Sequence, residues 1–399
     1  GSTSFQSPSP ALARESRALS AYLADQIEAN GGWISFERFM EIALYAPGMG
    51  YYTGRREIFG TEGDYVTAPG IGSLFATCLA GQIAEVFEAM GTPARPADAY
   101  DILEFGAGNG AMAVALLDAL AQRDALPKCY RILETSGPLQ SRQEEQVASL
   151  PSELRKRVQW IHSVPEKSCG VVLANEVLDA MPVQRFRVDR TGNAVLLGVT
   201  IRDGAFAWQA AATECEIVGA LGIVEQLDLP AGYESECSRL VPAWIRSVAD
   251  SLSRGLMILV DYGYDRRTYY HEDRSSGTLM CHYRHHAHTD PFLWPGLQDI
   301  TAHVDFTLVA DAAEAAGLEV LGYSDQAGFL LQAGLPALYA ERLETVGVGS
   351  KEAMALAAET RRLTMPQEMG EQFKVIALGR NVPQPSAFGE RNLLTRLWS

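Results

Sequence analysis

The chain has 399 residues, of which 47% are hydrophobic and 21% are charged, so it is long and apolar enough to bury a large core. The formal net charge of -16 excludes nonspecific binding to nucleic acid, which needs a basic surface, and mildly favours a cationic substrate. Six scattered cysteines without a C-x-x-C pair predict free thiols, and neither a signal peptide nor a membrane-spanning apolar run of ~18 residues is expected.

The first hundred residues predict helices and loops and no core strand. Residues 1–15 are rich in Ser, Pro and Ala, and we expect them to be disordered. Apolar residues at helical spacing predict amphipathic helices over 16–29, over 36–44 and over 73–90. Ser35 is the expected N-cap of the second helix.

From Tyr100 onward, apolar runs alternate with helical stretches, which is the pattern of a parallel sheet covered on both faces. Helices are expected from Ala111 and over 335–372. The expected strands are 100–105, 130–135, 158–162, 170–175, 256–262, 318–324 and 373–379. The predicted fold class is therefore α/β.

Two segments interrupt this alternation. Residues 183–233 contain the dipeptides Gly192-Asn193 and Asp203-Gly204, which are typical of the turns of β-hairpins. Residues 264–304 are rich in His, Arg, Tyr and Thr, and we interpret them as a second, loop-like insertion.

The segment from Tyr100 to Gly110 is expected to be a buried strand that runs into a glycine-rich turn. Gly106, Gly108 and Gly110 can adopt positive φ and leave the backbone open to a ligand, and the N–H groups of the following helix are electropositive. A nucleoside-like ligand fits this turn. Gly106 and Gly108 with Ala111 also match a dinucleotide fingerprint, and a turn without any ligand is the structural alternative.

Two acidic residues narrow the choice of ligand. Glu134 ends the second expected strand, where a carboxylate can accept both hydroxyls of a ribose, although a surface glutamate is the alternative. Glu104 stands two residues before the first glycine, where it would repel a pyrophosphate but attract an ammonium. S-adenosylmethionine (SAM) carries an ammonium and a sulfonium, so Glu104 favours SAM over NAD.

The fourth expected strand runs into Asn175-Glu-Val-Leu-Asp-Ala-Met-Pro182. Ligands of open α/β sheets bind beyond the carboxyl ends of the strands, so polar side chains here would face the transferred group. Glu176 and Asp179 would share one face of a helical turn and could clamp a guanidinium. Alternatively, Asp179 caps a helix or pairs with Arg185.

Two further groups of polar residues could carry chemistry. His303 and Asp305 could act as a base and its orienting carboxylate, or Asp305 could be the N-cap of a helix over 306–316. The stretch Cys281–His288 holds His282 and His286 at i, i+4 spacing. We favour a polar loop there over a metal site, because no partner carboxylate accompanies the histidines.

Taken in order along the chain, these motifs resemble the MidA-like SAM-dependent methyltransferases, whose mitochondrial members assist the assembly of respiratory complex I. The resemblance covers about 35–334. Its marks are Gly48-Met-Gly-Tyr-Tyr52, Gly63-Asp-Tyr-Val-Thr-Ala-Pro69, Glu104-Phe-Gly-Ala-Gly-Asn-Gly110, Asn175–Pro182, Asp261-Tyr-Gly263, Asp299-Ile-Thr-Ala-His-Val-Asp-Phe306, and Gln326 with Gly328-Phe-Leu-Leu.

The resemblance implies a class I methyltransferase sheet, which is Rossmann-like, with an N-terminal helical addition. It implies that SAM is held by Glu104, Gly106, Ala107, Gly108, Gly110, Glu134, Thr135 and Asn175, with Gly63, Asp64 and Thr67 closing over the methionine end. It also implies methylation of arginine in a protein. The candidate catalytic residues are Glu176 and Asp179, followed by Asp305 and then His303. No metal is expected. The family commonly has a Glu after the Pro of the N-terminal loop, where this chain has Gly70.

The expected organisation is a tail over 1–15, a helical and lid region over 16–98, a methyltransferase domain over 99–380 with insertions at 183–233 and 264–304, and a tail over 381–399. The expected partners are a protein that presents an arginine, such as a complex I subunit, and a second copy of the chain. Neither nucleic acid nor a membrane is expected. A bacterial chain would be cytoplasmic, and a eukaryotic one would act in the mitochondrial matrix.

Overall fold

The structure is a computed structural model that describes residues 7–54, 73–91, 100–212, 220–284 and 286–399. The chain divides into two compact units. The first comprises Gly1–Val66, Asp179–Val241 and Arg267–His303, and the second comprises Thr67–Leu178, Pro242–Arg266 and Val304–Ser399. Most of the N-terminal region and of the two expected insertions therefore falls in the first unit. Among the described residues, every helix is too short or too polar to cross a bilayer.

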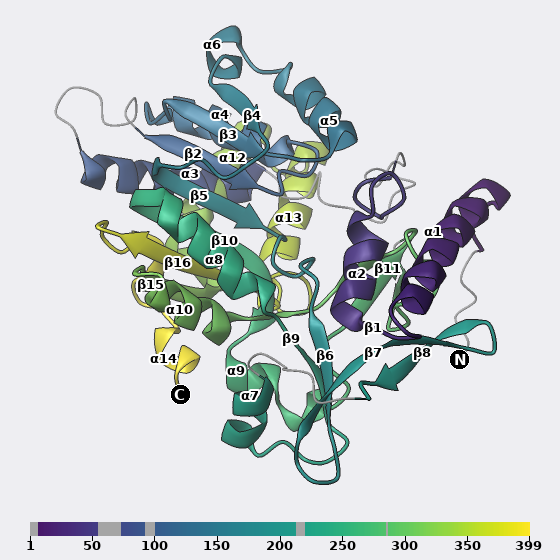
Figure 1. Cartoon of the computed structure of the whole chain (residues 1–399). Helices are drawn as coiled ribbons and strands as arrows, with labels where there is room; N and C mark the ends of the chain where they lie inside the picture. Colours follow the sequence, from purple (N-terminus) through teal and green to yellow (C-terminus); the bar gives the residue numbers. More distant parts are fainter. Residues whose placement is uncertain (1–6, 55–72, 92–99, 213–219, 285) are drawn as a thin grey trace. The chain divides into compact units, whose positions relative to one another are not determined.

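The second unit is built on a mixed sheet (Figure 1). Its strands are β2 (Asp101–Phe105), β3 (Cys129–Leu133), β4 (Val158–Ile161), β5 (Ser168–Asn175), β10 (Leu252–Tyr264), β14 (Val304–Asp305), β15 (Glu319–Asp325) and β16 (Phe373–Arg380). The strand order is β15-β16-β10-β5-β2-β3-β4, and β14 pairs with β10. Strands β4, β3, β2, β5 and β10 are parallel, whereas β16 and β15 join antiparallel.

The order of the parallel strands reverses beside β2. The chain runs from β2 to β3 and β4 on one side, then returns to place β5 on the other side of β2. Open α/β sheets bind their ligands at such a reversal, beyond the carboxyl ends of the strands. The glycine turn that follows β2 and the segment that follows β5 both lie at this point.

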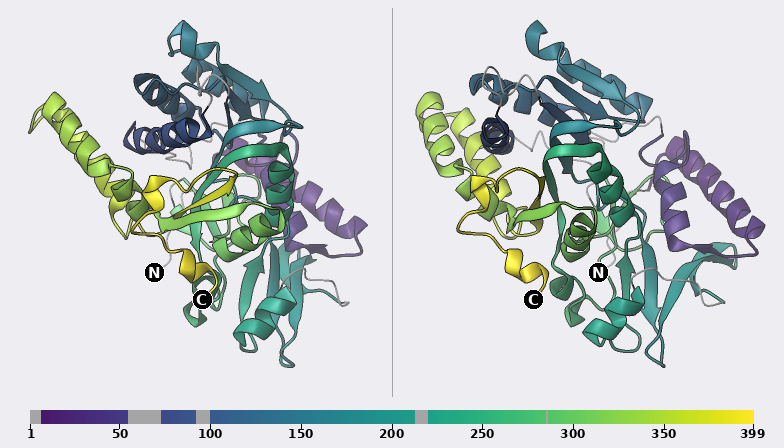
Figure 2. Two further views of the ribbon diagram at one scale, coloured as in Figure 1. Left: turned by 90° about the vertical axis from the view of Figure 1, so that its left-hand side faces the viewer. Right: turned by 60° about the vertical axis from the view of Figure 1, so that its left-hand side comes forward.

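Helices cover both faces of this sheet. They are α3 (Ser73–Met90), α4 (Ala111–Gln122), α5 (Gly137–Val147), α6 (Ser152–Arg155), α8 (Leu240–Ser251), α10 (Phe306–Ala315), α11 (Gln326–Gln332), α12 (Leu335–Val346), α13 (Lys351–Thr364) and α14 (Leu394–Leu397). One face forms a continuous apolar core with α3, α4, α11 and α13. On the other face, Phe105 packs edge-on against Trp244 of α8, with ring centroids 4.9 Å apart. Figure 2 shows these layers from two further directions.

The first unit is organised around antiparallel sheets. Its strands are β1 (Ile34–Ser35), β6 (Gln184–Val188), β7 (Ala194–Arg202), β8 (Ala205–Ala210), β9 (Glu234–Cys237), β11 (Met280–Tyr283), β12 (His286–His288) and β13 (Asp299–Thr301). They form a sheet of order β1-β7-β6-β9, with β8 beside β7, and a second sheet of order β12-β11-β13. Helices α1 (Pro10–Ala29), α2 (Phe36–Tyr45) and α7 (Ala220–Leu227) belong to this unit, and α9 (Arg266–Tyr269) leads back into it. Its core clusters the buried faces of α1 and α2 with residues of β7, β11 and β13.

The expected strands are confirmed to within a few residues, because most of them are apolar runs buried in the sheet, whereas β4 at the sheet edge is only partly buried. Both hairpin turns are confirmed, with β6–β7 turning at Gly192 and β7–β8 at Gly204. Ser35 caps α2 as expected, and its Oγ accepts from Arg38 N at 3.2 Å.

Three expectations of secondary structure away from the site are wrong. Helix α1 begins at Pro10, so residues 10–15 are helical, because Ser9 caps the helix and Pro10 suits its first turn. The expected helix 335–372 is broken by Gly347, whose φ of 79° ends α12, and α13 stops at Thr364. The expected loop 264–304 contains the three paired strands β11, β12 and β13.

Candidate active site

Gly106, Gly108 and Gly110 all adopt the left-handed backbone that the sequence led us to expect, with φ of 65°, 54° and 86°. A Cβ at Gly106 would lie 2.5 Å from Val177 Cγ2, so the turn closely approaches the segment after β5. Gly110 is the N-cap of α4 and offers no side-chain cap. The first N–H groups of α4 can therefore attract negative charge.

Glu104 lies at the end of β2 and is fully buried. Its Oε2 accepts a hydrogen bond of 2.8 Å from the hydroxyl of Tyr130 on β3. Burial raises the pKa of Glu104 to about 7, and the bond from Tyr130 only partly offsets this. Among the described residues, Oε1 has no hydrogen-bond partner. A buried carboxylate oxygen in this position can accept from an ammonium of a ligand on the glycine turn.

Glu134 follows β3 and is 8% exposed. Its Oε1 accepts from Ser136 N at 2.7 Å, and its Oε2 accepts from Gln143 Nε2 at 2.9 Å. The same Gln143 amide group donates to the carbonyl of Gly108 at 3.0 Å. The structure thus links Glu134 to the glycine turn through Gln143, a residue that no motif in the sequence singled out.

The remaining predicted cofactor residues lie around this edge in varied settings. Ala107 is buried within the turn, and Thr135 is exposed directly after Glu134. Asn175 ends β5, and its Nδ2 lies 3.4 Å from Glu176 Oε1. Gly63, Asp64 and Thr67 lie outside the described residues, as does Gly70.

The segment after β5 is an irregular turn, so the expectation of a helical turn that carries Glu176 and Asp179 is wrong. Glu176 adopts a left-handed backbone with φ of 52°, which is uncommon for a residue with a side chain. The buried Asp261 on β10 explains this path. Its Oδ2 accepts from Val177 N at 3.2 Å and from Leu178 N at 2.8 Å, which holds the backbone away from helical geometry.

Asp179 belongs to the first unit, whereas Glu176 belongs to the second. Asp179 is 3% exposed, and its backbone carbonyl accepts from Ala302 N at 2.9 Å. The alternatives of a helix cap and of an ion pair with Arg185 are not realised, since the Arg185 guanidinium binds Glu234 and Glu236 instead.

Two tyrosines and a second aspartate accompany Asp179. Tyr45 donates its hydroxyl to the carbonyl of Ala180 at 2.9 Å, and Tyr52 donates to Asp299 Oδ1 at 2.9 Å. The two rings stack with centroids 5.5 Å apart. The pKa of both tyrosines is raised. Burial of the hydroxyls is the larger cause, and the negative charge of Asp299 is the next. Tyr45 still leaves 38% of its surface exposed, so part of this residue is accessible beside buried carboxylates.

Asp305 is the N-cap of α10, which confirms the structural alternative for this residue. Its Oδ1 accepts from Thr307 N and Leu308 N, at 3.0 and 3.1 Å. Its Oδ2 accepts from Arg266 Nε at 3.2 Å. Burial raises the pKa of Asp305, and the Arg266 charge opposes that rise. His303 lies in the other unit, where its backbone N–H donates to Thr278 Oγ1.

Comparison with known proteins shows the family to which the chain belongs. The family profile for S-adenosyl-L-methionine-dependent methyltransferases called Methyltransf_28 matches residues 78–324. The chain belongs to this methyltransferase family.

Individual relatives agree with this assignment. A Burkholderia thailandensis protein crystallised with S-adenosyl-homocysteine is 40% identical, with a TM-score of 0.89 over 98% of this chain and 99% of that protein. The Caenorhabditis elegans mitochondrial homolog of the protein arginine methyltransferase NDUFAF7 is 27% identical over 93% of this chain and 88% of its own length. Human NDUFAF7, named a mitochondrial protein arginine methyltransferase, is 25% identical over 87% of this chain and 80% of its own length.

The resemblance stated from the motifs is thus confirmed, together with the Rossmann-like α/β fold, the methyltransferase activity and SAM as the cofactor. The residues present fit SAM, since the turn has the left-handed glycine backbone, Glu104 has a free acceptor oxygen among the described residues, and Glu134 presents a carboxylate at the neighbouring strand end.

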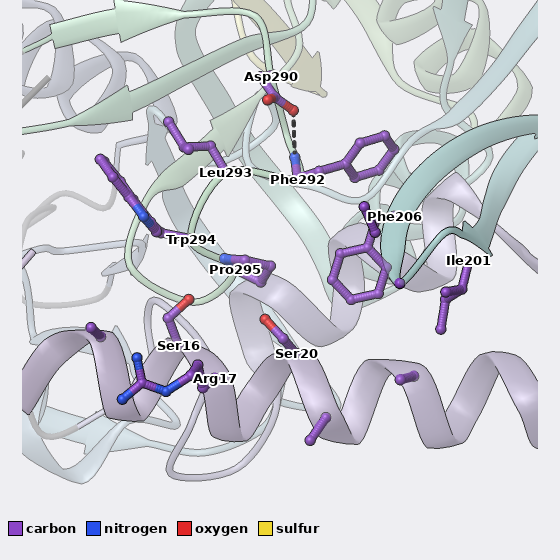
Figure 3. Close-up of a pocket in the computed structure, with 15 residues that line it drawn as sticks. Ser16, Arg17, Ser20, Ile201, Phe206, Asp290, Phe292, Leu293, Trp294 and Pro295 are labelled. Carbon is purple, nitrogen blue, oxygen red and sulfur yellow. Dashed lines mark hydrogen bonds between the residues drawn. The ribbon is translucent and has the colours of Figure 1, made fainter. Parts of the chain in front are cut away.

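We also searched the described residues for metal-binding groups and for pockets. The described residues contain no group of three or more His, Cys, Asp or Glu side chains arranged to hold a metal ion. A pocket of about 730 Å³ opens in the first unit between α1, the β7–β8 turn and the loop 290–295 (Figure 3). Arg17 and Ser20 on α1 line it with Phe206 and Trp294, and none of the predicted site residues that the structure describes does so.

Proposed function

We propose that this methyltransferase methylates a guanidinium nitrogen of an arginine in a protein. SAM supplies the methyl group. The names of the relatives support a protein arginine as the acceptor, since the Caenorhabditis elegans and human proteins are both called protein arginine methyltransferases. The net charge of -16 also favours a cationic acceptor.

In this proposal the second unit binds SAM. Glu104 accepts from the ammonium of the methionine moiety, the glycine turn supports the cofactor, and Glu134 accepts the ribose hydroxyls. The further candidate contacts are Ala107, Thr135 and Asn175, with Gly63, Asp64 and Thr67 beyond the described residues. The free Oε1 of Glu104 among the described residues is the observation that best supports this placement.

In the second unit, we propose Glu176 as a residue that binds the guanidinium of the methyl acceptor. It follows β5 at the strand-order reversal, and its backbone is fixed on both sides. Its own N–H donates to Val260 O at 2.9 Å, and the next two N–H groups donate to Asp261. A carboxylate on a strained and well-held backbone is suited to orienting a guanidinium, because little ordering remains to be done on binding.

In the first unit, we propose Asp179 as a residue that binds the guanidinium of the methyl acceptor. It is supported by its neighbours, of which Tyr52 and Asp299 belong to the sequence motifs and Tyr45 does not. The partly exposed Tyr45 stacks on Tyr52, and Tyr52 is hydrogen-bonded to the buried Asp299. An accessible aromatic residue backed by carboxylates attracts a cation such as a guanidinium. His303 and Asp305 remain second candidates.

The direct test is methylation by purified enzyme with isotope-labelled SAM, read by mass spectrometry on cell proteins. We expect label on arginine side chains. Glu176→Gln and Asp179→Asn should each lower the methylation rate at least tenfold while the dissociation constant for S-adenosyl-homocysteine stays within threefold of wild type. Matched controls are Glu166→Gln in the second unit and Asp203→Asn in the first, because both carboxylates are exposed.

The outcomes separate the alternatives. Label on a small molecule or on another type of side chain would show that the acceptor is not the arginine that we propose. Binding of S-adenosyl-homocysteine without any label would indicate a SAM-binding assembly factor. Unchanged methylation in both variants would remove Glu176 and Asp179 from the site. We further propose a subunit of respiratory complex I as the acceptor, because the motifs resemble a family whose mitochondrial members assist the assembly of that complex.

A further inference from the structure

A buried glutamine connects the two parts of the cofactor edge. Gln143 lies on α5, a polar helix in which only Gln143 and Val147 are buried. Its amide nitrogen Nε2 donates both to the carbonyl of Gly108 at 3.0 Å and to Glu134 Oε2 at 2.9 Å. One side chain therefore ties the glycine turn after β2 to the carboxylate after β3.

Trp160 on β4 determines which way this amide points. Its indole Nε1 lies 3.0 Å from Gln143 Oε1. An indole N–H can only donate, so the amide oxygen of Gln143 must face Trp160. The amide N–H groups then have to face Gly108 and Glu134. The orientation of Gln143 is thus set by chemistry, and both of its N–H donors are used.

The hydrogen bonds of Glu134 leave a defined acceptor capacity. A carboxylate has about four acceptor positions on its two oxygens. Ser136 N–H occupies one position on Oε1, and Gln143 occupies one on Oε2. Counting the bonds within the described part of the chain, one position on each oxygen remains, which matches the two hydroxyls of a ribose. Because both oxygens are held, the carboxylate also cannot rotate away from the glycine turn.

Close packing keeps Gln143 in place. A Cβ on Gly110 would lie 3.1 Å from the Cα of Gln143, so the backbone of α5 lies tightly against the start of α4. Gln143 itself has no exposed surface. The amide therefore has no alternative position in water.

We propose that Gln143 is a positioning residue for SAM. Gln143 holds the Glu134 carboxylate and the Gly108 carbonyl at a fixed separation. The carboxylate that accepts the ribose hydroxyls therefore keeps a fixed position relative to the glycine turn. This inference rests on the placement of SAM proposed above. Gln143 acts through Glu134 and the turn, and it needs no contact of its own with the cofactor.

The test is calorimetric binding of S-adenosyl-homocysteine to Gln143→Ala and Gln143→Glu, each compared with wild type at pH 5.5 and pH 9. The matched control is Gln140→Ala on the same helix, whose amide only bonds Glu144. We expect Gln143→Ala to weaken binding at least tenfold at both pH values, and Gln140→Ala to stay within twofold of wild type.

Gln143→Glu distinguishes positioning from simple packing. At pH 9 the introduced carboxylate repels Glu134, and we expect binding at least a hundredfold weaker than wild type. At pH 5.5 the introduced carboxyl is protonated and can donate to Glu134 as the amide did, so the deficit should shrink at least tenfold. A deficit that is equal at both pH values would overturn the proposal, even if Gln143→Ala does not fold.

Glu134→Gln separates this inference from the placement on which it rests. If Glu134→Gln binds S-adenosyl-homocysteine as wild type does, the ribose placement is wrong. If Glu134→Gln weakens binding whereas both Gln143 variants bind as wild type does, the placement stands and the role of Gln143 is wrong. In the Glu134→Gln background, the pH-dependent recovery of Gln143→Glu should disappear.

Discussion

At the scale of single residues, Glu104 combines a cost in stability with a proposed role in binding. A fully buried carboxyl with one hydroxyl donor is poorly solvated, so its pKa rises to about 7. A bound ammonium would restore the favourable environment of the charged form. Buried, perturbed carboxyls are typical of functional sites for this reason.

The stability of the folded chain should therefore depend on the protonation of Glu104. The folded pKa is raised from 4.5 to about 7, so the folded state holds the extra proton between these values. Stability from this group is fully present below pH 4.5 and falls as the pH rises through 7, by up to about 3 kcal/mol. Glu104→Gln keeps the size and an acceptor for Tyr130. At pH 8, we expect it to raise the melting temperature of the ligand-free enzyme.

The same substitution should weaken the cofactor complex. We expect Glu104→Gln to bind S-adenosyl-homocysteine at least tenfold more weakly than wild type at pH 8, because no carboxylate faces the ammonium. Wild-type affinity should fall as the pH drops below 7, and the variant should lack that fall. A variant that is less stable than wild type at pH 8, or that binds as tightly, would refute this account of Glu104.

At the scale of elements, α10 is secured by Asp305. The carboxylate satisfies two free N–H groups of the helix and pairs with Arg266, which also binds Asp311 on α10. These bonds give Asp305 a structural role that does not require contact with the substrate. A structural and a catalytic role can still be separated, because Asn caps helices about as well as Asp does.

Asp305→Ala should lower stability by about 1–3 kcal/mol, since it removes the cap and leaves Arg266 without that partner. Asp305→Asn should recover most of this loss in chemical denaturation. If Asp305 acts only as a cap, the methylation rate of Asp305→Asn will stay near wild type. A large loss of rate in a stable Asp305→Asn would instead establish a catalytic role. Ser350→Ala, which uncaps α13, is the matched control for cap loss alone.

At the scale of the whole molecule, the chain folds into two units that are each assembled from three separate segments. Of the proposed cofactor residues, those that the structure describes lie in the second unit, and the first unit carries Asp179 with its tyrosines and Asp299. The chain as a whole carries a net charge of -16. Charges of one sign attract a basic partner from a distance, and salt screens that attraction within about 10 Å.

Methylation of a basic protein acceptor should therefore weaken with salt through KM. Between 50 and 300 mM NaCl we expect KM to rise at least threefold and kcat to change less than twofold. The affinity for S-adenosyl-homocysteine should stay nearly constant, because its contacts are local and buried. A KM that is independent of salt would show that long-range charge does not recruit the acceptor.

Much of the fold and part of the site follow from local sequence. Most core strands are apolar runs, and the glycine turn, the two hairpin turns and the caps Ser35 and Asp305 depend on residues within a few positions of one another. Backbone conformation responds to such neighbours directly. The location of Glu104 and Glu134 near strand ends was also predictable, because both strands are recognisable in the sequence.

Only the tertiary structure decided the rest. Gln143 contacts Gly108, Glu134 and Trp160 through separate elements, and Tyr52 reaches Asp299 from the other end of the chain. The spacing of the residues after Glu176 predicted a helical turn. Asp261, which is far away in sequence but lies on the neighbouring strand β10, accepts from the N–H groups of Val177 and Leu178 instead. Hydrogen bonds between residues far apart in sequence depend on sheet order and packing, and those are absent from any local pattern. The sequence alone thus determined the strands and the cofactor turn, whereas packing decided which side chains surround them.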